Sequence, residues 1–338
     1  MRRLTFISAL VAAAAAMSLA GEAAGWGSTG HRVIGRLALQ ALPPELPDFL
    51  RGLDAVEAVG EYAREPDRWK GSGRAHDADQ DPAHFLDLGD DGRIFGGPAL
   101  QDLPDTRAAY DASLRAVSSD SWKAGYLPYA IIETWQQLAN DLTFWRVENA
   151  AIARVKDPAH LAWFRMDMAA RQALVLRDVG VLAHYAGDGS QPLHVTVHFN
   201  GWGPYPNPER YATEHIHGPF EGPYVHDMVD PAAVARRIGP YRPCSCRIEA
   251  WTRDYLQADN RQVVPFYRLW KAGGFAGGDP RGKAFGEERL AAGATAVRDL
   301  IAQAWDASAA SKVGWPGPIT VAQVEAGLDP YDALYGVD

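Results

Sequence analysis

The chain has 338 residues, of which 47% are hydrophobic and 22% are charged, and its formal net charge is −9. A chain of this length can bury one large core or two smaller ones. The negative charge excludes a broad basic face for nucleic acid or an anionic membrane, so a phosphate-containing substrate would need a local source of positive charge.

Residues 1–25 have the pattern of a secretory signal peptide. Arg2 and Arg3 precede the apolar run LTFISALVAAAAAMSLA, and small residues follow before Trp26. An uncleaved anchor is the alternative, but the small residues favour cleavage before Trp26. The mature chain would then keep 313 residues (338 minus 25) with a net charge of −10, since two arginines and one glutamate are lost. We expect residues 26–338 to be one secreted or periplasmic domain with no stable membrane insertion.

Hydrophobic periodicity predicts helices along most of the chain. In chain order, the expected helical segments are 29–43, which stops at Pro43, 106–117, which Asp105 can cap, 129–155, 171–188 and 290–305. The fourth segment is so apolar that we expect it to be central. Alternating strand patterns are hard to find, and the segments rich in Gly and Pro predict loops at 88–98, 199–210 and 272–282. The sequence therefore predicts an all-α fold, a single mainly helical domain with long loops.

The two cysteines, Cys244 and Cys246, are separated by one residue. Export favours oxidation, so they are either two thiols or one local disulfide in a loop. The chain has no further cysteine for a zinc–thiolate site. A zinc site would therefore use histidine and carboxylate ligands.

The motif HYAGDGSQPLH places candidate ligands at the end of the apolar helix. His184 and Asp188 are four residues apart and project from one helix face, and His194 follows after a turn. In HGPFE, His217 and Glu221 have the same spacing. A single pair of this kind is most often a helix-surface hydrogen bond. Two pairs and an intervening histidine favour a metal site, since buried polar groups need partners.

Two upstream motifs add weaker candidates. PDRWK contains Asp67, which could instead be a cap or turn residue. HFLDL contains His84, which alone could be a packed histidine, followed by Phe85. We do not assign the remaining histidines as ligands. His198 could lie near the ligands. His215 is not included among the ligands, because no carboxylate stands four residues after it, and His76, His160 and His226 are expected at the surface.

These motifs, with a Trp and a His near the mature N-terminus, resemble a known superfamily. It unites zinc-dependent phospholipase C with the plant- and fungal-type single-strand-specific zinc nucleases. The matching residues, which span the mature N-terminus to about two-thirds of the chain, are Trp26, His31, Asp67, His84, His184, Asp188, His194, His217 and Glu221. WGSTGH resembles the nuclease branch, and HIHGPFEGPYV, with Glu as its acidic residue, resembles the phospholipase branch. The Gly-Gly-Asn stretch of the nuclease branch is absent, and FNGWGPYPNPERY stands there instead.

The resemblance implies three zinc ions bound between helices. It assigns one zinc to Asp67, His84, His184 and Asp188, a second to His194, His217 and Glu221, and a third to the α-amino nitrogen and carbonyl oxygen of Trp26, His31 and the other oxygen of Asp188. Three carboxylates would carry −3 against +6 from the metals. The site would then be locally cationic inside an acidic protein.

The resemblance also implies roles in catalysis. Two close zinc ions would share and acidify a water that attacks phosphorus, and Asp67 would steer this water or accept its proton. Lys70 matches a basic position of the nuclease branch that holds a phosphate oxygen, although it could be a solvated surface lysine. Phe85 could stack a base or could simply pack in the core.

Three functions are consistent with this reading. The first is an exported zinc endonuclease that hydrolyses RNA and single-stranded DNA, which the WGSTGH spacing favours. The second is a zinc-dependent phospholipase C or a related phosphodiesterase acting on phospholipid. The third is a non-catalytic zinc-binding protein of the same fold. Nothing in the sequence implies a protein partner.

Overall fold

The computed structural model describes residues 26–336, so the expected signal peptide lies outside the described residues. Within this range the chain is mainly helical, with isolated β-bridges in place of a sheet, which confirms the all-α prediction. None of the described helices is long and apolar enough to cross a membrane.

The α-helices are α1 (Gly27–Gln40), α2 (Leu53–Tyr62), α3 (Glu65–Arg68), α4 (Arg74–Gln80), α5 (Arg107–Arg115), α6 (Ser121–Ala124), α7 (Leu127–Ile152), α8 (Pro158–Asp188), α9 (His217–Pro219), α10 (Val225–Met228), α11 (Pro231–Arg237), α12 (Ile248–Asn260), α13 (Val263–Lys271), α14 (Pro280–Ser308), α15 (Val321–Glu325) and α16 (Tyr331–Tyr335). Short helical turns are η1 (Asp48–Leu50), η2 (Asp81–His84), η3 (Leu100–Asp102), η4 (Pro192–His194) and the π-helical turn η5 (Phe220–Tyr224).

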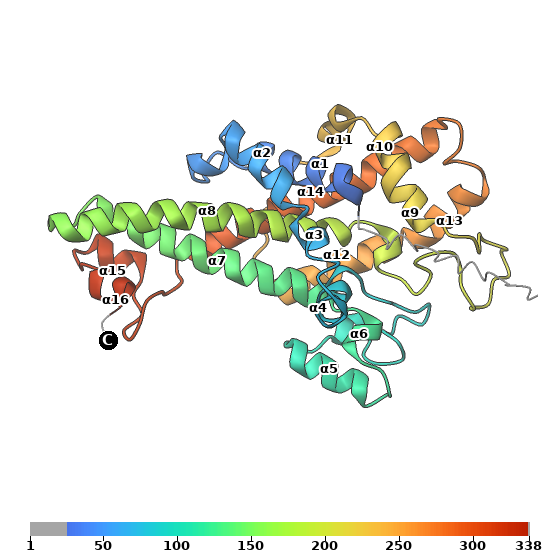
Figure 1. The fold of residues 1–338 in the computed structure, drawn as a ribbon, viewed down its shortest axis with the longest axis horizontal. Coiled ribbons are helices and arrows are strands. Elements are labelled where there is room, and N and C mark those ends of the chain that lie inside the picture. The colour runs from blue at the N-terminus through green and yellow to red at the C-terminus, as the bar shows by residue number, and fades with distance from the viewer. Residues whose placement is uncertain (1–25, 337–338) are drawn as a thin grey trace, which may run out of the picture.

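The long helices α7 and α8 form an antiparallel hairpin that runs through the molecule (Figure 1). Every residue of α8 from Asp178 to Asp188 is buried, so the apolar segment is central, as its composition predicts. The helices α1, α2 and α14 pack against this hairpin. The stripe predicted for the last long helix is also in the core, with Leu290, Val297 and Ile301 fully buried.

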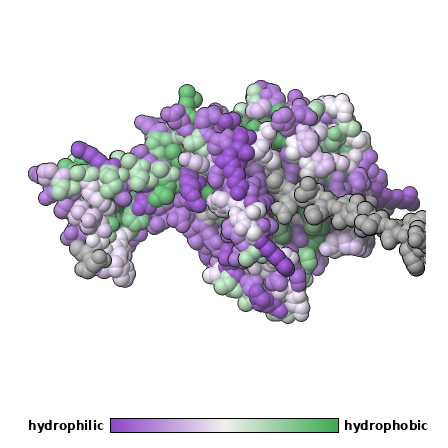
Figure 2. Space-filling model, in the orientation of Figure 1, coloured by the Kyte–Doolittle hydropathy of each residue, from purple (hydrophilic) through white to green (hydrophobic). Residues whose placement is uncertain are grey.

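The first half of α8 extends beyond the main core as an arm with the end of α7 (Figure 1). The segments around α15 and α16 pack on this arm and form a second, smaller hydrophobic cluster that includes Val147, Phe164 and Val324. On the face shown in Figure 2, hydrophobic residues of the arm lie in small groups among hydrophilic ones. The sequence pattern did not predict the first part of α8, from residue 158 to 170, because an arm exposed on several sides carries no continuous apolar stripe.

Some predicted boundaries and caps differ in the structure. Thr106, and not Asp105, caps α5 by accepting a hydrogen bond from the Ala109 amide at 3.2 Å. The predicted loop 272–282 is shorter than expected, because Asp279 caps α14 and this helix begins at Pro280. Both differences arise from side-chain hydrogen bonds to helix ends, which hydrophobic periodicity does not report. The two cysteines, Cys244 and Cys246, form a disulfide.

Candidate metal centre

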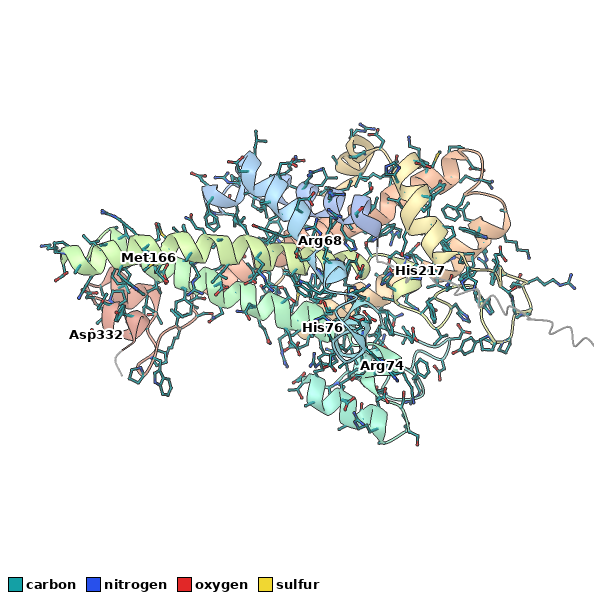
Figure 3. All side chains as sticks on the ribbon, viewed as in Figure 1. Arg68, Arg74, His76, Met166, His217 and Asp332 are labelled. Atoms are coloured by element: carbon teal, nitrogen blue, oxygen red, sulfur yellow. A yellow bond between two sulfur atoms is a disulfide. The ribbon has the colours of Figure 1, made fainter. Side chains whose placement is uncertain are left out.

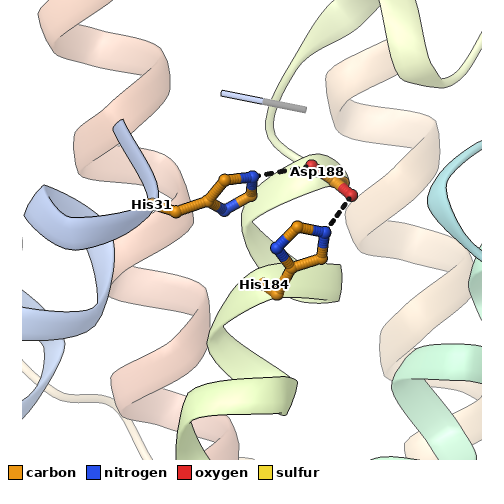
Figure 4. Close-up of side chains that lie close together, drawn as sticks. All are labelled: His31, His184 and Asp188. Carbon is orange, nitrogen blue, oxygen red and sulfur yellow. Dashed lines mark ion pairs between the residues drawn. The ribbon is translucent and has the colours of Figure 1, made fainter. Parts of the chain in front are cut away.

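The end of α8 supplies the first two candidate ligands. His184 and Asp188 lie one turn apart and are fully buried, with His184 Nε2 at 3.3 Å from Asp188 Oδ2 (Figure 4). The Nδ1 of His184 lies 2.9 Å from the carbonyl oxygen of Ala63, where only a donor fits. This hydrogen bond uses the Nδ1 proton, so Nε2 is the nitrogen that faces the carboxylate and that a metal ion could bind, as in the histidines of metal sites.

His31 on α1 approaches the same carboxylate from the other side. Its Nε2 lies 3.4 Å from Asp188 Oδ1, and its ring stacks on His184 with the centroids 4.0 Å apart (Figure 4). Both ring nitrogens of His31 are buried without a hydrogen-bond partner. Buried imidazole nitrogens without partners are costly unless something else satisfies them.

Trp26 ties the start of α1 to the end of α8. Its side chain is fully buried, and the indole Nε1 donates to the Gly187 carbonyl at 2.8 Å and to Ser190 Oγ at 3.0 Å. Gly27 has a φ of +58°, and a Cβ there would lie 3.1 Å from the carbonyl oxygen of Glu221. Glycine thus allows α1 to begin against the segment that carries Glu221.

Asp67 on α3 and His84 at the end of η2 complete the first group. The Nδ1 of His84 lies 3.1 Å from Asp188 Oδ2 and 2.9 Å from His184 Nε2. One oxygen of Asp67 is 3.9 Å from each of these two imidazoles, and the other is 3.8 Å from His31 Nε2. Asp188 therefore directs one oxygen to His31 and the other to His84 and His184, which is the arrangement a bridging carboxylate requires.

His194, His217 and Glu221 form a second group. Glu221 Oε2 lies 2.7 Å from His217 Nε2 and 3.5 Å from His194 Nε2, and all three residues are buried. The Nδ1 of His194 donates to the carbonyl oxygen of His84 at 2.6 Å, so the two groups are joined and Nε2 is the nitrogen that faces Glu221. Asn200 accepts hydrogen bonds from the amides of Ile216 and His217 through Oδ1, which fixes the start of α9.

The electrostatics of these groups suit a metal ion. Burial lowers the pKa of His31 to about 3 and that of His84 to about 4, so both imidazoles are neutral at neutral pH. Burial acts to raise the pKa of Asp188, but the surrounding histidines, His184 first, hold it well below its usual range. Burial acts to lower the pKa of His194, yet Asp188 and Glu221 raise it to about 9, so a metal ion at His194 would displace a proton.

The residues therefore fit metal ions. Ligand atoms converge in three groups, within 4.8 Å of one another in each group: His31, His184 and Asp188; Asp67, His84 and His184; and His194, His217 and Glu221. All eight predicted side-chain ligands are brought together. His184 belongs to two of these groups, whereas the family resemblance assigns it to one zinc. The main-chain ligands expected from Trp26 stay a prediction, and its carbonyl oxygen accepts a hydrogen bond from the Gly30 amide at 3.1 Å.

A cavity of about 540 Å³ opens beside the second and third of these groups. His84, His194 and His217 reach its wall, and the remaining lining residues are Lys70, Asp81, Pro82, Phe85, Asp87, Phe95, Trp122, Lys123, Leu193 and Phe199. The ammonium of Lys70 lies 2.9 Å from Asp67 Oδ1 and is only 12% exposed. Lys70 is thus not a solvated surface lysine, and Phe85 is half-buried at the cavity and outside the core.

Sequence reasoning missed several residues of this wall. Asp87 is buried there, and burial raises its pKa to about 8, so the carboxyl is protonated at neutral pH. A signal was present, because Phe85 is extended and residues two apart in an extended segment point to the same side. The aromatic residues of the wall, Phe95, Trp122 and Phe199, carry no such signal, since each is a single residue in a loop or a short helix. The same holds for Asn200, which lies outside the wall and positions His217.

The remaining histidines are not in the metal groups. His198 is buried, but it contacts Trp202 and Asp90 and no candidate ligand. His160 pairs with Asp329 at 2.8 Å on the arm. His217 lies far from Met166 and Asp332, which mark that arm in Figure 3.

No family model and no curated protein matches this chain.

Proposed function

We propose that the chain is an exported zinc-dependent phosphodiesterase whose substrates are RNA and single-stranded DNA. The observation that carries this proposal is the convergence of eight histidine and carboxylate side chains beside one open cavity. Zinc takes such ligands where thiolates are absent. A structural zinc site is closed, whereas His84, His194 and His217 reach a cavity that can admit a substrate.

We propose three zinc ions, divided among the ligands as the family resemblance implies, with the α-amino group of Trp26 as a ligand after signal-peptide cleavage. Zinc ions in such a site lower the pKa of a bound water and neutralise the charge of a phosphate. They would make the site locally cationic inside a chain whose net charge is negative.

The protein groups at the border of the cavity have separate roles. Asp67 is 16% exposed and is the least buried of the carboxylates, so it can orient the attacking water or accept its proton. It also holds Lys70, whose ammonium binds a non-bridging phosphate oxygen. Phe85 offers a ring at the cavity on which a base next to the phosphate can stack.

A substrate panel on zinc-loaded protein that begins at Trp26 tests the proposal. We expect acid-soluble nucleotides from RNA and single-stranded DNA, hydrolysis of bis-p-nitrophenyl phosphate, and loss of both activities with a chelator. Lys70→Ala should lower kcat/KM on nucleic acid, whereas the exposed control Lys271→Ala should not.

Two results would replace the proposal. Release of diacylglycerol from phosphatidylcholine, without nucleotide release, would make the protein a phospholipase C. Absence of hydrolysis of every ester by the zinc-loaded protein would make it a non-catalytic zinc-binding protein.

A further inference from the structure

Three aromatic side chains are exposed around the cavity beside the metal groups. Phe95 is 41% exposed, Trp122 is 57% exposed and Phe199 is 48% exposed, and all three line the cavity. They come from the loop between η2 and η3, from α6, and from the loop that follows η4. We call these three residues the aromatic rim. Exposed apolar side chains gathered at one site mark a binding surface, because their burial would otherwise stabilise the fold.

The backbone holds Phe95 in a conformation that disfavours a bulky residue. Its φ is +46°, in the left-handed region. The surrounding loop is closed by hydrogen bonds from the Ile94 amide to Pro98 and from the Gly97 amide to Ile94, and the Ile94 side chain is fully buried. Backbone strain of this kind is unfavourable and persists mainly at functional sites. The loop thus fixes an exposed ring at the cavity against its backbone preference.

The other two rim residues are also held in place. Asp120 caps α6, and the Ser121 hydroxyl donates to Asp111 at 2.9 Å, so the short helix that carries Trp122 is anchored at its start. Phe199 precedes Asn200, whose side chain accepts the hydrogen bond from the His217 amide. Phe199 is therefore attached to a residue that positions the candidate metal ligand His217.

The charges around the rim suit a polyanion. Lys70 and Lys123 line the same cavity, and the ammonium of Lys123 is 4.0 Å from Asp120, on the solvent-exposed side of α6. Asp87 is uncharged at neutral pH, as burial raises its pKa to about 8, which leaves Asp81 as the acidic side chain of the wall. Stacking rings combined with positive groups are the means by which proteins bind single strands without sequence preference.

We propose that the aromatic rim stacks the bases of a single-stranded polynucleotide on either side of the phosphate held at the metal groups. This inference rests on the proposed nuclease function and extends the site beyond Phe85. Because stacked bases contribute individually, longer single strands should bind more tightly than dinucleotides, and a duplex, whose bases are already stacked, should not use the rim.

Removal of each rim ring tests the inference. We expect Trp122→Ala, Phe199→Ala and Phe95→Asn, which keeps a residue tolerant of positive φ, each to raise KM for a single strand of about 12 nucleotides roughly 5- to 150-fold. The kcat/KM for bis-p-nitrophenyl phosphate, which has no flanking nucleotides, should fall by a smaller factor than that for the strand. The control Tyr335→Ala removes a ring that is also 57% exposed, on α16, and should change neither constant.

A second measurement does not depend on activity. The dissociation constant of a labelled 12-nucleotide strand with a cleavage-resistant phosphorothioate backbone, measured by fluorescence anisotropy on the zinc-loaded protein, should rise by the same factor in the rim variants. For a strand of equal length without bases, the rim variants and the wild-type protein should bind alike. Circular dichroism checks that each variant is folded.

Three results would overturn the inference. The first is rim variants that cleave and bind the single strand as the wild type does. The second is an equal loss of affinity for the strand without bases. The third is a loss of binding to phosphatidylcholine vesicles in place of the oligonucleotide, which would make the rim a lipid-binding surface. A wild-type protein that hydrolyses bis-p-nitrophenyl phosphate but no nucleic acid would instead refute the proposed nuclease function itself.

Discussion

Asp188→Asn is expected to remove more than one metal ion, because one carboxylate faces histidines from three segments. Asp188 Oδ1 lies 3.4 Å from the Nε2 of His31, and Oδ2 lies 3.1 Å from His84 Nδ1 and 3.3 Å from His184 Nε2. Asparagine keeps the shape but turns one ligand oxygen into an NH₂ donor and removes one negative charge. Loss of a residue that only supports a ligand weakens metal binding about 10- to 100-fold, so loss of a shared ligand should cost at least about 100-fold at each group.

The assay is the metal content of folded protein after dialysis against limiting zinc, measured by atomic emission. Asp178→Asn is the matched control, since Asp178 is also buried on α8 but lies ten residues earlier, about 15 Å along the helix. The control should keep the wild-type content, and Asp188→Asn should lose two of three proposed ions. A folded Asp188→Asn protein that retained the wild-type zinc content would refute the bridging geometry.

Four further outcomes are expected. Chelation should lower the unfolding free energy by about 4 kcal/mol for each zinc ion that is present at about 1,000 times its Kd. The Tm should then fall by on the order of 10 °C or more and recover when zinc is added, and an unchanged Tm would argue against a metal centre. Burial raises the pKa of Glu148 from 4.5 to about 9, so the folded protein holds a proton that the unfolded chain releases, and stability falls as pH rises between these values. Glu148→Gln should remove up to about 1.4 kcal/mol of this loss of stability per pH unit. The measurement is Tm at several pH values. The exposed control Glu133→Gln should keep the wild-type dependence of Tm on pH. One extra residue before Trp26 should empty one zinc site selectively, and a full zinc content in the extended protein would mean that Trp26 is only a packed aromatic residue. His160→Ala should leave the metal content unchanged.

Much of the fold follows from local patterns. The apolar run at 171–188 identified the central helix, and the stripe from Leu290 to Ile301 identified α14, because helical periodicity is written in consecutive residues. The arm, with α15 and α16 packed on it, was not foreseeable in the same way. Its small core joins residues near 147 and 164 with residues near 319 and 324, and no short stretch of sequence carries that pattern.

The sequence by itself determined which residues can bind a metal and which of them share a helical turn. The four-residue spacing of His184 with Asp188 and of His217 with Glu221 is a local property of a helix, and the structure keeps both pairs. Only the tertiary structure decided that α1, α3 and η2 bring His31, Asp67 and His84 to Asp188. The tertiary structure also decided which ring nitrogen of His184 and His194 faces the carboxylates. It placed three aromatic residues, far apart in the sequence, around one cavity. These features depend on packing between segments up to about 160 residues apart, as the bond from the Trp26 indole to Gly187 illustrates, and such contacts leave no periodic trace in the chain.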